Sequence, residues 1–253
     1  MSSRGSNTTA TASAACLVAC EFMETSRWEE AQENELAIWE RTTTNVAHVL
    51  AEIAEAAVLV RFGTDHGLAT NSTVLELGIG PMSIGWAAFA SCTRAIGVDP
   101  LPRLAITTGD DNVDQFVTDL QQRTEFLQAD ATRQLPLDDG SFDLIVCDNV
   151  VDHAQDPRAV LAEGRRIVRS DGRMLFGVNV FSTIGRLKWR QVTRRLHPRE
   201  PNVLCHPHSF LEGEIGGLLL SAGWEILASD DPRSARQRLT GHAYRVRVVA
   251  RPI

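Results

Sequence analysis

In the N-terminal part of this chain, hydrophobic and polar positions alternate with the period of an α-helix. The segment RWEEAQENELAIWE, from Arg27 to Glu40, contains neither Gly nor Pro and consists mostly of good helix formers. One face of this predicted helix carries two tryptophans beside two polar residues: Trp28, Gln32, Glu35 and Trp39. A second helix is predicted after Asn45, which is a suitable N-cap, and its apolar stripe ends near Gly63.

After these helices the period changes to short apolar runs, which are typical of buried parallel strands. Two further helices interrupt them, at Pro157–Val168 and at Ser209–Ala222. Asp171-Gly172 predicts a turn before the fifth run. The predicted strands are Thr73–Leu77, Arg94–Asp99, Glu125–Asp130, Phe142–Asp148, Arg173–Val180, Trp224–Ala228 and Ala243–Ala250. Strands that alternate with helices predict an α/β fold with a doubly wound, mostly parallel, seven-stranded sheet.

This pattern divides the chain into three parts. We expect residues 1–20 to form a poorly ordered tail, residues 21–62 a helical cap, and residues 63–253 the sheet-containing domain. An insert at 182–208 is basic although the protein is acidic, since Glu200 is its only acid. Its cations are Arg186, Lys188, Arg190, Arg194, Arg195 and Arg199. We interpret the insert either as a solvated surface or as a lid whose arginines bind an anionic group.

Composition excludes several classes of function. The chain has 253 residues and a formal net charge of −7, so no global basic field attracts nucleic acid or an anionic membrane. Five widely spaced cysteines predict free thiols in a reducing compartment, and the N-terminal region has no apolar run long enough for a secretory signal. We therefore expect a cytoplasmic protein. The spacing of Cys16 and Cys20 is weak evidence for zinc, and we expect no metal.

The strands end in residues suited to a nucleoside-containing cofactor. The run Glu76-Leu77-Gly78-Ile79-Gly80 turns sharply after the first strand, and the following helix is expected to offer free N–H groups. Asp99 ends the second strand, where a carboxylate can bind ribose hydroxyls, and Asp130 ends the third, where it can accept from an adenine amine.

Two residues argue against a nicotinamide dinucleotide as this cofactor. Ser83 occupies the third glycine position of G-x-G-x-x-G, and the carboxylate of Glu76 would repel a pyrophosphate. A cofactor with a cationic amino-acid end, such as S-adenosylmethionine, suits Glu76 better.

These motifs resemble the class I S-adenosylmethionine-dependent methyltransferases, in particular their small-molecule branch sometimes called type 11. The resemblance covers roughly Val74 to the C-terminus and is carried by VLELGIGP, GVDP and the stretch from FLQADA to GRMLF. It implies a Rossmann-like sheet with one antiparallel strand. It also implies a cofactor site at Glu76, Gly78, Ile79, Gly80, Asp99, Pro100, Asp130, Ala131, Asp148 and Asn149. The sequence departs from the family's E-x-G-x-G-x-G run at Met82, where the third glycine is expected.

Several residues are candidates for acceptor chemistry. His153, just after the fourth strand, is placed to act as a general base, and the alternative is that it braces the next helix. His206 and His208, in Cys205-His206-Pro207-His208, are expected to line the acceptor pocket, with His208 as a second candidate base. The remaining candidates for substrate contact are Trp28, Trp39, Arg194 and Arg195.

The resulting hypothesis is a methyltransferase that modifies an oxygen or nitrogen of a small molecule by in-line displacement. The expected acceptor is a sugar, nucleotide-sugar or secondary metabolite, with an anionic group bound by the lid, and the enzyme is expected to be a monomer or homodimer. The alternative is a methyltransferase-like protein that binds the cofactor without catalysing transfer. A nicotinamide-dependent reductase is a third, less favoured interpretation.

Overall fold

The computed structural model describes residues 25–196, 203, 205–230 and 243–253. The expected N-terminal tail and Arg199 lie outside these residues. The described chain forms an eight-stranded sheet in the order β3-β2-β1-β4-β5-β8-β7, with β6 paired to β5. Strands β1 to β6 pair in parallel, whereas β8 runs antiparallel to both β5 and β7. This confirms the predicted doubly wound, mostly parallel fold.

Most strand boundaries agree with the pattern of apolar runs. The strands are β1 (Thr73–Leu77), β2 (Arg94–Asp99), β3 (Glu125–Gln128), β4 (Phe142–Asp148), β5 (Val168–Phe181), β6 (Phe210–Leu211), β7 (Trp224–Asp230) and β8 (Tyr244–Pro252). The main difference is β5, which begins before the predicted turn. Residues between Val168 and Arg173 form an irregularity opposite Phe142 and Leu144, so the strand continues through Asp171-Gly172.

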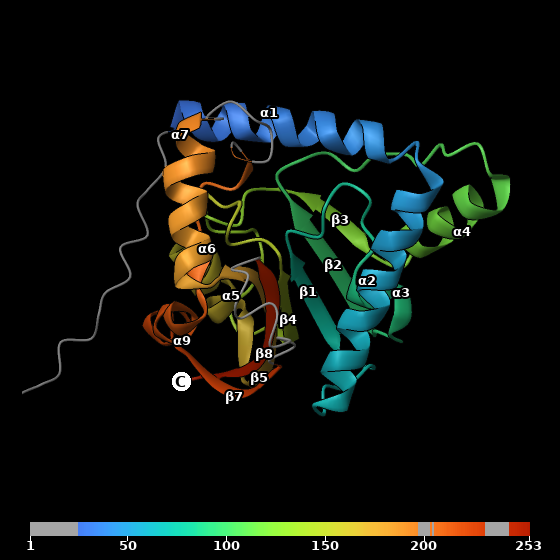
Figure 1. Cartoon of the computed structure of the whole chain (residues 1–253). Coiled ribbons are helices and arrows are strands. Elements are labelled where there is room, and N and C mark those ends of the chain that lie inside the picture. Colours follow the sequence, from blue (N-terminus) through green and yellow to red (C-terminus); the bar gives the residue numbers. More distant parts are fainter. Residues whose placement is uncertain (1–24, 197–202, 204, 231–242) are drawn as a thin grey trace, which may run out of the picture.

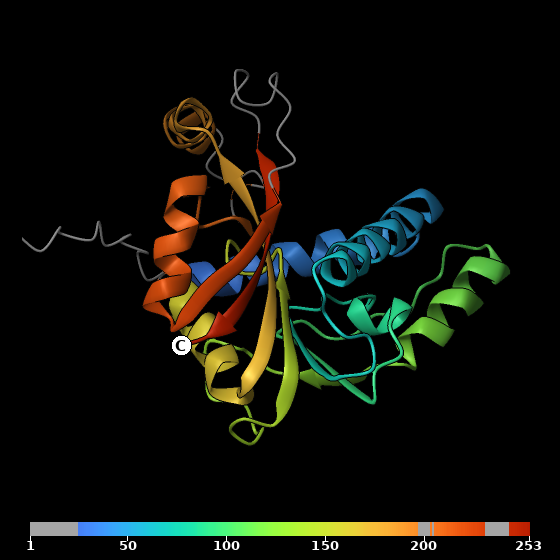
Figure 2. The same cartoon turned by 90° about the horizontal axis from the view of Figure 1, so that it is seen from below.

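The helices cover both faces of this sheet. They are α1 (Thr25–Thr42), α2 (Val46–Asp65), α3 (Trp86–Phe89), α4 (Asp111–Gln121), α5 (Pro157–Ile167), α6 (Thr183–Lys188), the π-helix η1 (Trp189–Thr193), α7 (Arg194–Leu196) and α9 (Glu212–Ser221). Figure 2 shows α5 and α9 on one side of the sheet and α2, α3 and α4 on the other. Among the described residues, no helix combines the length and apolar character that a bilayer span requires.

Local capping explains where several helices begin. Asn45 caps α2 by accepting from the backbone N–H of His48, as predicted, and Asp156 caps α5 ahead of Pro157. The late helix begins three residues after the predicted Ser209. Leu211 is its N-cap, because the backbone N–H of Leu211 donates to the carboxylate of Glu214. Phe210 and Leu211 pair instead with β5, which adds the short strand β6.

The two N-terminal helices differ in how they pack. Helix α2 runs through the expected domain boundary at residue 62, and its Leu59, Val60 and Phe62 belong to the hydrophobic core on one face of the sheet. Helix α1 lies across the end of the sheet instead (Figure 1). This position places one face of α1 over the carboxyl ends of the parallel strands, where open α/β sheets bind their ligands.

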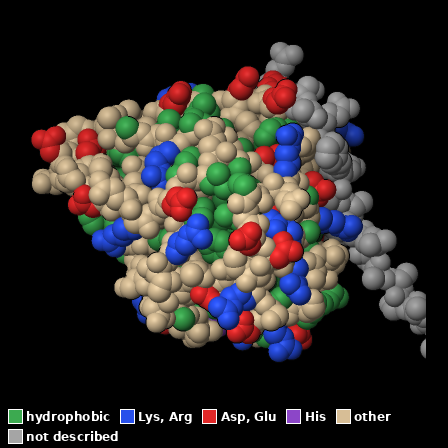
Figure 3. All heavy atoms as spheres, turned by 180° about the vertical axis from the view of Figure 1, so that it is seen from behind, with side chains coloured by type: hydrophobic (Ala, Val, Ile, Leu, Met, Phe, Trp, Pro, Cys, Tyr) green, Lys and Arg blue, Asp and Glu red, His purple; other side chains and the backbone are tan. Residues whose placement is uncertain are grey.

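On the face of the molecule opposite to the view in Figure 1, neither positive nor negative side chains predominate. On the face in Figure 3, basic and acidic groups are interspersed around a central group of hydrophobic side chains. This view shows no extended basic patch of the kind that nucleic-acid-binding proteins carry.

Candidate functional site

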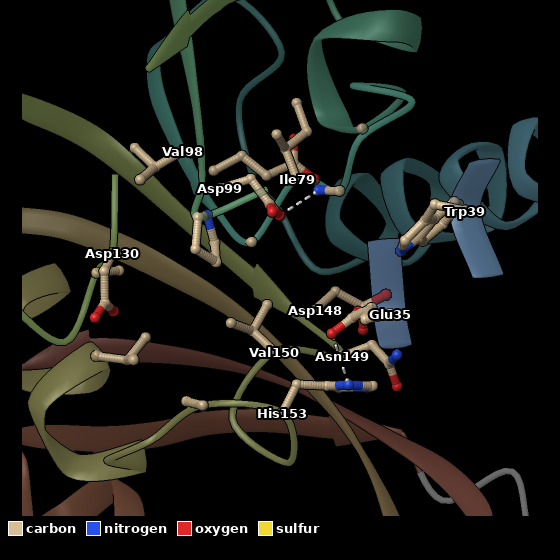
Figure 4. A pocket seen from close by; sticks show the side chains of 18 of the residues that line it. Glu35, Trp39, Ile79, Val98, Asp99, Asp130, Asp148, Asn149, Val150 and His153 are labelled. Carbon is tan, nitrogen blue, oxygen red and sulfur yellow. Dashed lines mark hydrogen bonds and ion pairs between the residues drawn. The ribbon is translucent and has the colours of Figure 1, made fainter. Parts of the chain in front are cut away.

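A cavity of about 240 Å³ lies at the carboxyl ends of β1, β2 and β4, beneath helix α1. All ten residues that the resemblance assigns to the cofactor line it: Glu76, Gly78, Ile79, Gly80, Asp99, Pro100, Asp130, Ala131, Asp148 and Asn149. The complete polar and aromatic stripe of α1 lines it as well, namely Trp28, Gln32, Glu35 and Trp39. The cavity therefore has one wall from the strand ends and one from α1 (Figure 4).

The glycine turn after β1 shapes the floor of this cavity. Gly78 and Gly80 have positive φ angles of 67° and 76°, a conformation that favours glycine. A Cβ atom on Gly78 would lie 2.4 Å from Val150, so this position also requires a residue without a side chain. The indole of Trp39 covers Gly80, 3.6 Å from the position that a Cβ would take there.

The segment after this turn differs from expectation, because α3 is a single four-residue turn and not a long helix. Its first N–H, from Trp86, donates to Oε2 of Glu76 at 2.9 Å. Burial raises the pKa of Glu76 to about 7, although this hydrogen bond opposes the shift. Glu76 therefore stabilises the turn and also lines the cavity. The backbone N–H of Trp86, which the sequence predicts to be free for a ligand, already donates to Glu76.

Asp99 holds the glycine turn against the end of β2. Its two carboxylate oxygens accept from the backbone N–H groups of Gly80 and Leu101, at 2.8 and 2.9 Å. Burial raises the pKa of Asp99 to about 7, and the two N–H donors oppose this shift. Each oxygen keeps a second lone pair with which a carboxylate can accept from a hydroxyl of a ligand.

Asp130 has one carboxylate oxygen available. Its Oδ1 accepts from the backbone N–H of Thr132 at 2.9 Å, whereas Oδ2 is buried without a hydrogen-bond partner and lies 3.9 Å from the exposed guanidinium of Arg133. A buried acceptor without a partner is costly, so this atom calls for a donor such as an amine. Together with the glycine turn and Asp99, this orphaned oxygen fits the predicted nucleoside-containing cofactor.

Asp148 belongs to a charged group that sequence reasoning missed. Its Oδ2 lies 3.1 Å from Nη1 of Arg245 on β8, and Arg247 lies 3.1 Å from Glu55 on α2. Arg245 and Glu55 line the cavity, as does Glu52. Their separation in the chain explains the omission, because only the antiparallel pairing of β8 with β5 brings Arg245 beside the end of β4.

Asn149, the residue after Asp148, adopts a left-handed conformation with φ of 61°. Its side-chain oxygen accepts from the amide of Asn179 on β5 at 2.6 Å. Asparagine tolerates this conformation better than most residues, and the bond to β5 fixes the loop that leads to His153.

His153 lines the cavity and faces α1, where Oε2 of Glu35 lies 3.6 Å from its Nδ1. Figure 4 shows the two side chains pointing toward one another. Burial lowers the pKa of the imidazole, but the negative charges of Asp152 and Glu35 outweigh burial and raise the pKa of His153 to about 9. Asp152, His153 and His206 have side-chain N and O atoms within 4.8 Å of one another, so they can share a proton or a cation.

The structure separates the residues of Cys205-His206-Pro207-His208. Cys205 faces α1, with its Sγ 3.7 Å from the carbonyl of Ala31. The His206 ring packs against His153 with 4.2 Å between ring centroids. His208 is bonded through Nε2 to the carbonyl of Ala154 at 2.9 Å. Neither His206 nor His208 is among the described lining residues, but His206 contacts the His153 ring and His208 contacts the Ala154 backbone, and both of these partners line the cavity.

Arg186 and Arg195 of the basic insert lie apart from the cavity. Arg186 binds Glu214 on α9, and Arg195 is exposed to solvent. Neither belongs to the described lining of the cavity, and the Arg194 side chain lies outside the described residues. The described part of the insert therefore gives no support to a lid that places its arginines on the acceptor.

Comparisons with known proteins find methyltransferases among the proteins that this chain is similar to. Residues 75–176 match the model of a family described as a methyltransferase domain. A transposon-encoded protein of Streptomyces fradiae is 36% identical over 111 residues, which cover 42% of this chain and 29% of the relative. A human thiol S-methyltransferase is 29% identical over 134 residues, which cover 50% of this chain and 51% of the relative. The chain thus spans about half or less of the length of these curated relatives.

The fold also matches solved methyltransferases. One is 1,6-didemethyltoxoflavin-N1-methyltransferase from Burkholderia thailandensis, solved with bound 1,6-didemethyltoxoflavin and S-adenosylhomocysteine. It has a TM-score of 0.54 and 15% identity, and the match covers 90% of this chain and 86% of that structure. The family match and this fold agree with a cavity whose residues suit S-adenosylmethionine. Residues 75–176 of this chain are therefore similar to a methyltransferase domain, and the described chain has the fold of solved methyltransferases.

Proposed function

We propose that this protein transfers the methyl group of S-adenosylmethionine to a nitrogen or oxygen of a small molecule, with His153 as general base. The observation that carries the proposal is the common cavity. Glycines 78 and 80, the carboxylates of Asp99 and Asp130, and the imidazole of His153 all line it. Bound S-adenosylmethionine supplies a methyl group that its sulfonium has already activated, so the protein needs chiefly to align donor and acceptor.

Residues on the strand side are assigned to the cofactor. The second lone pairs of Asp99 are assigned to ribose hydroxyls, and the orphaned Oδ2 of Asp130 to the adenine amine. Glu76 lines the same cavity, and its carboxylate form is suited to the cationic amino-acid end. The turn at Gly78 and Gly80 lets the backbone approach the ligand closely.

Residues on the α1 side are assigned to the acceptor. His153 is partly buried and close to two carboxylates, Asp152 and Glu35, which stabilise the protonated form of the imidazole. In its neutral form it accepts the proton that the acceptor loses. Trp28 and Trp39 supply the aromatic wall of the cavity.

Calorimetric titration with S-adenosylmethionine and S-adenosylhomocysteine tests the cofactor assignment. We expect both to bind the wild type, and Asp130→Asn to weaken binding by about tenfold, because it replaces an orphaned acceptor oxygen without touching the glycine turn. Asp139→Asn, an exposed replacement outside the cavity, is the matched control. Absence of binding to either compound would refute the proposal.

Turnover tests separate catalysis from cofactor binding alone. The purified protein is incubated with S-adenosylmethionine and a panel of amines, phenols and alcohols, and methylated products are detected by mass spectrometry. Product formation that His153→Gln reduces by a factor of about 10² or more is expected for a general base. Cofactor binding without any product would favour the non-catalytic alternative.

A further inference from the structure

The polar groups of the cavity are mainly carboxylates. Seven carboxylates line it: Glu35, Glu52, Glu55, Glu76, Asp99, Asp130 and Asp148. The basic groups among its described lining residues are only His153 and Arg245. The proposed cofactor site accounts for Glu76, Asp99, Asp130 and Asp148, which leaves Glu35, Glu52 and Glu55 on the acceptor side.

Both basic groups of the lining already have carboxylate partners. Arg245 lies 3.1 Å from Asp148 and 3.8 Å from Glu55, and His153 lies 3.6 Å from Glu35. An anionic acceptor entering this cavity would find both cations paired and would also face the carboxylates of Glu35 and Glu52. Like charges at close range in a partly desolvated site repel strongly. The lining therefore disfavours the anionic acceptor that the basic insert suggests.

One unpartnered atom of the lining favours the opposite charge. The carbonyl oxygen of Gln32 is buried without a hydrogen-bond partner, whereas Oδ1 of Asp148 lies 3.9 Å from Nε of Arg247. The Gln32 oxygen is an acceptor and therefore calls for an N–H donor from a ligand. Glu35 remains an anion: burial raises its pKa, but the contacts with His153 and the Trp39 indole outweigh burial and lower it.

Two indoles complete this arrangement. Trp28 and Trp39 lie at the two ends of the α1 stripe, with Gln32 and Glu35 between them, and all four residues line the cavity. Indole faces attract organic cations, and a desolvated carboxylate beside them strengthens that attraction. This combination of aromatic faces, an anionic carboxylate and an unpartnered carbonyl is chemically suited to an ammonium group.

We infer that the acceptor is a small organic amine that enters the cavity as an ammonium ion, bound by Glu35 and Trp39. This inference rests on the proposed function and specifies its substrate class. The ammonium gives one proton to the neutral imidazole of His153, and the nitrogen lone pair then forms the new N–C bond. The S–C bond breaks, with its electron pair going to sulfur, and the product is a methylated ammonium.

The test measures the charge preference of the cavity in the full-length wild type. Choline is compared with 3,3-dimethylbutan-1-ol, in which carbon replaces the cationic nitrogen, and with the anion 3,3-dimethylbutanoate. Each is titrated calorimetrically with S-adenosylhomocysteine present. We expect choline to bind at least about tenfold more tightly than its neutral isostere, and the anion to bind least. Equal or weaker binding of choline, tighter binding of the anion, or no binding of choline would overturn the inference.

A matched pair of variants on α1 locates the preference. Glu35→Gln removes the lining carboxylate, whereas Glu33→Gln makes the same change at an exposed residue that is not part of the lining. We expect the preference for choline to fall by about tenfold in Glu35→Gln and to be retained in Glu33→Gln. An unchanged preference in Glu35→Gln would contradict the assignment. The wild-type titrations decide the charge preference even if a variant fails to fold.

The same titrations distinguish this inference from the proposed function. Each probe is also titrated without S-adenosylhomocysteine, so the charge preference is measured independently of cofactor binding. If S-adenosylhomocysteine binds but the cavity does not prefer choline over its neutral isostere, only the assignment of an amine acceptor is refuted. If S-adenosylhomocysteine does not bind, the proposed function is refuted. A preference for choline in the absence of S-adenosylhomocysteine would still support a cation site in the cavity.

Discussion

Oε2 of Glu35 on helix α1 lies 3.6 Å from Nδ1 of His153, which follows the fourth strand. This pair joins the N-terminal helix to the carboxyl ends of the sheet across the cavity. Burial lowers the pKa of His153, but the charges of Asp152, Glu35 and Asp99 together raise it to about 9. The imidazole is therefore protonated at neutral pH, and its capacity to accept a proton increases as the pH rises.

The first prediction concerns the pH dependence of methyl transfer. Because only a neutral imidazole accepts a proton, we expect kcat/KM to rise with pH until about 9. Glu35→Gln removes a negative charge that favours the imidazolium, so the midpoint of this rise should move to lower pH. The ring of His206 also packs against His153 and is unchanged in this variant.

The measurement is a pH–rate profile with one acceptor throughout, so that the ionisation of the acceptor is common to all variants. Glu33→Gln serves as the control and should keep the wild-type midpoint. If the Glu35→Gln profile coincides with the wild-type profile, ionisation of His153 does not determine the rise of kcat/KM with pH.

The second prediction concerns the pH dependence of cofactor binding. Burial raises the pKa values of both Glu76 and Asp99 to about 7, so both take up protons as the pH falls below 7. Ribose hydroxyls and an ammonium group bind the carboxylate form better than the acid form. We therefore expect affinity for S-adenosylmethionine to increase as the pH rises from about 5.5 to 8, with protons released on binding at the lower pH.

Calorimetry in two buffers with different ionisation enthalpies measures this proton release directly. Asp99→Asn should reduce the number of protons released, because one of the two titrating groups is gone. Affinity that is independent of pH over this range would contradict the prediction.

The third prediction concerns Gly85, which precedes the short helix α3. A Cβ atom on Gly85 would lie 2.0 Å from Oε2 of Glu76, so any side chain displaces that carboxylate from the N–H of Trp86. We expect Gly85→Ala to cost about 1–3 kcal/mol of unfolding free energy, as for the loss of a buried charged hydrogen bond. It should also weaken binding of S-adenosylhomocysteine.

The control for Gly85→Ala is Gly216→Ala in the interior of α9. Gly216 has open space where a Cβ would lie, and alanine favours helix formation. Thermal melts of both variants and calorimetry with S-adenosylhomocysteine are the measurements. A Gly85→Ala variant as stable and as tightly binding as the wild type would mean that Glu76 relocates without cost.

Buried parallel strands are the part of this fold that the sequence predicts best. Strands β1, β2 and β4 have the predicted boundaries, because strands covered on both faces are continuous apolar runs that end abruptly at polar residues. The same abrupt ends predict the residues of the cavity floor, such as Asp99 and Asp148. The stripe on α1 is also visible in the sequence, since Glu35 stands at helical spacing from the two tryptophans.

Residues contributed by distant elements could not be predicted in this way. Arg245 approaches Asp148 only through the pairing of β8 with β5, and no local pattern near residue 245 marks it as part of a cavity. The two histidines around Pro207 have the same local signal, yet only His206 packs against His153, whereas His208 binds the Ala154 carbonyl. Side-chain direction in an irregular segment depends on tertiary packing and not on spacing.

The last prediction concerns Met82, which stands where the family's motif has a third glycine. Among the described non-glycine residues, positive φ angles occur at Ser83 and Asn149, so the left-handed position of this turn falls one residue after Met82. The Met82 side chain is buried and packs in a hydrophobic cluster with Val49, Ile106 and Val117. Glycine at position 82 would therefore remove core packing without relieving any backbone strain. We expect Met82→Gly to lower the unfolding free energy by about 3 kcal/mol or more and to leave the affinity for S-adenosylhomocysteine no better than that of the wild type. Met82→Leu keeps most of the buried volume and should cost less than about 1.5 kcal/mol. Denaturant unfolding and calorimetry measure both effects, and tighter cofactor binding by a stable Met82→Gly protein would show that the motif's third glycine is needed here after all.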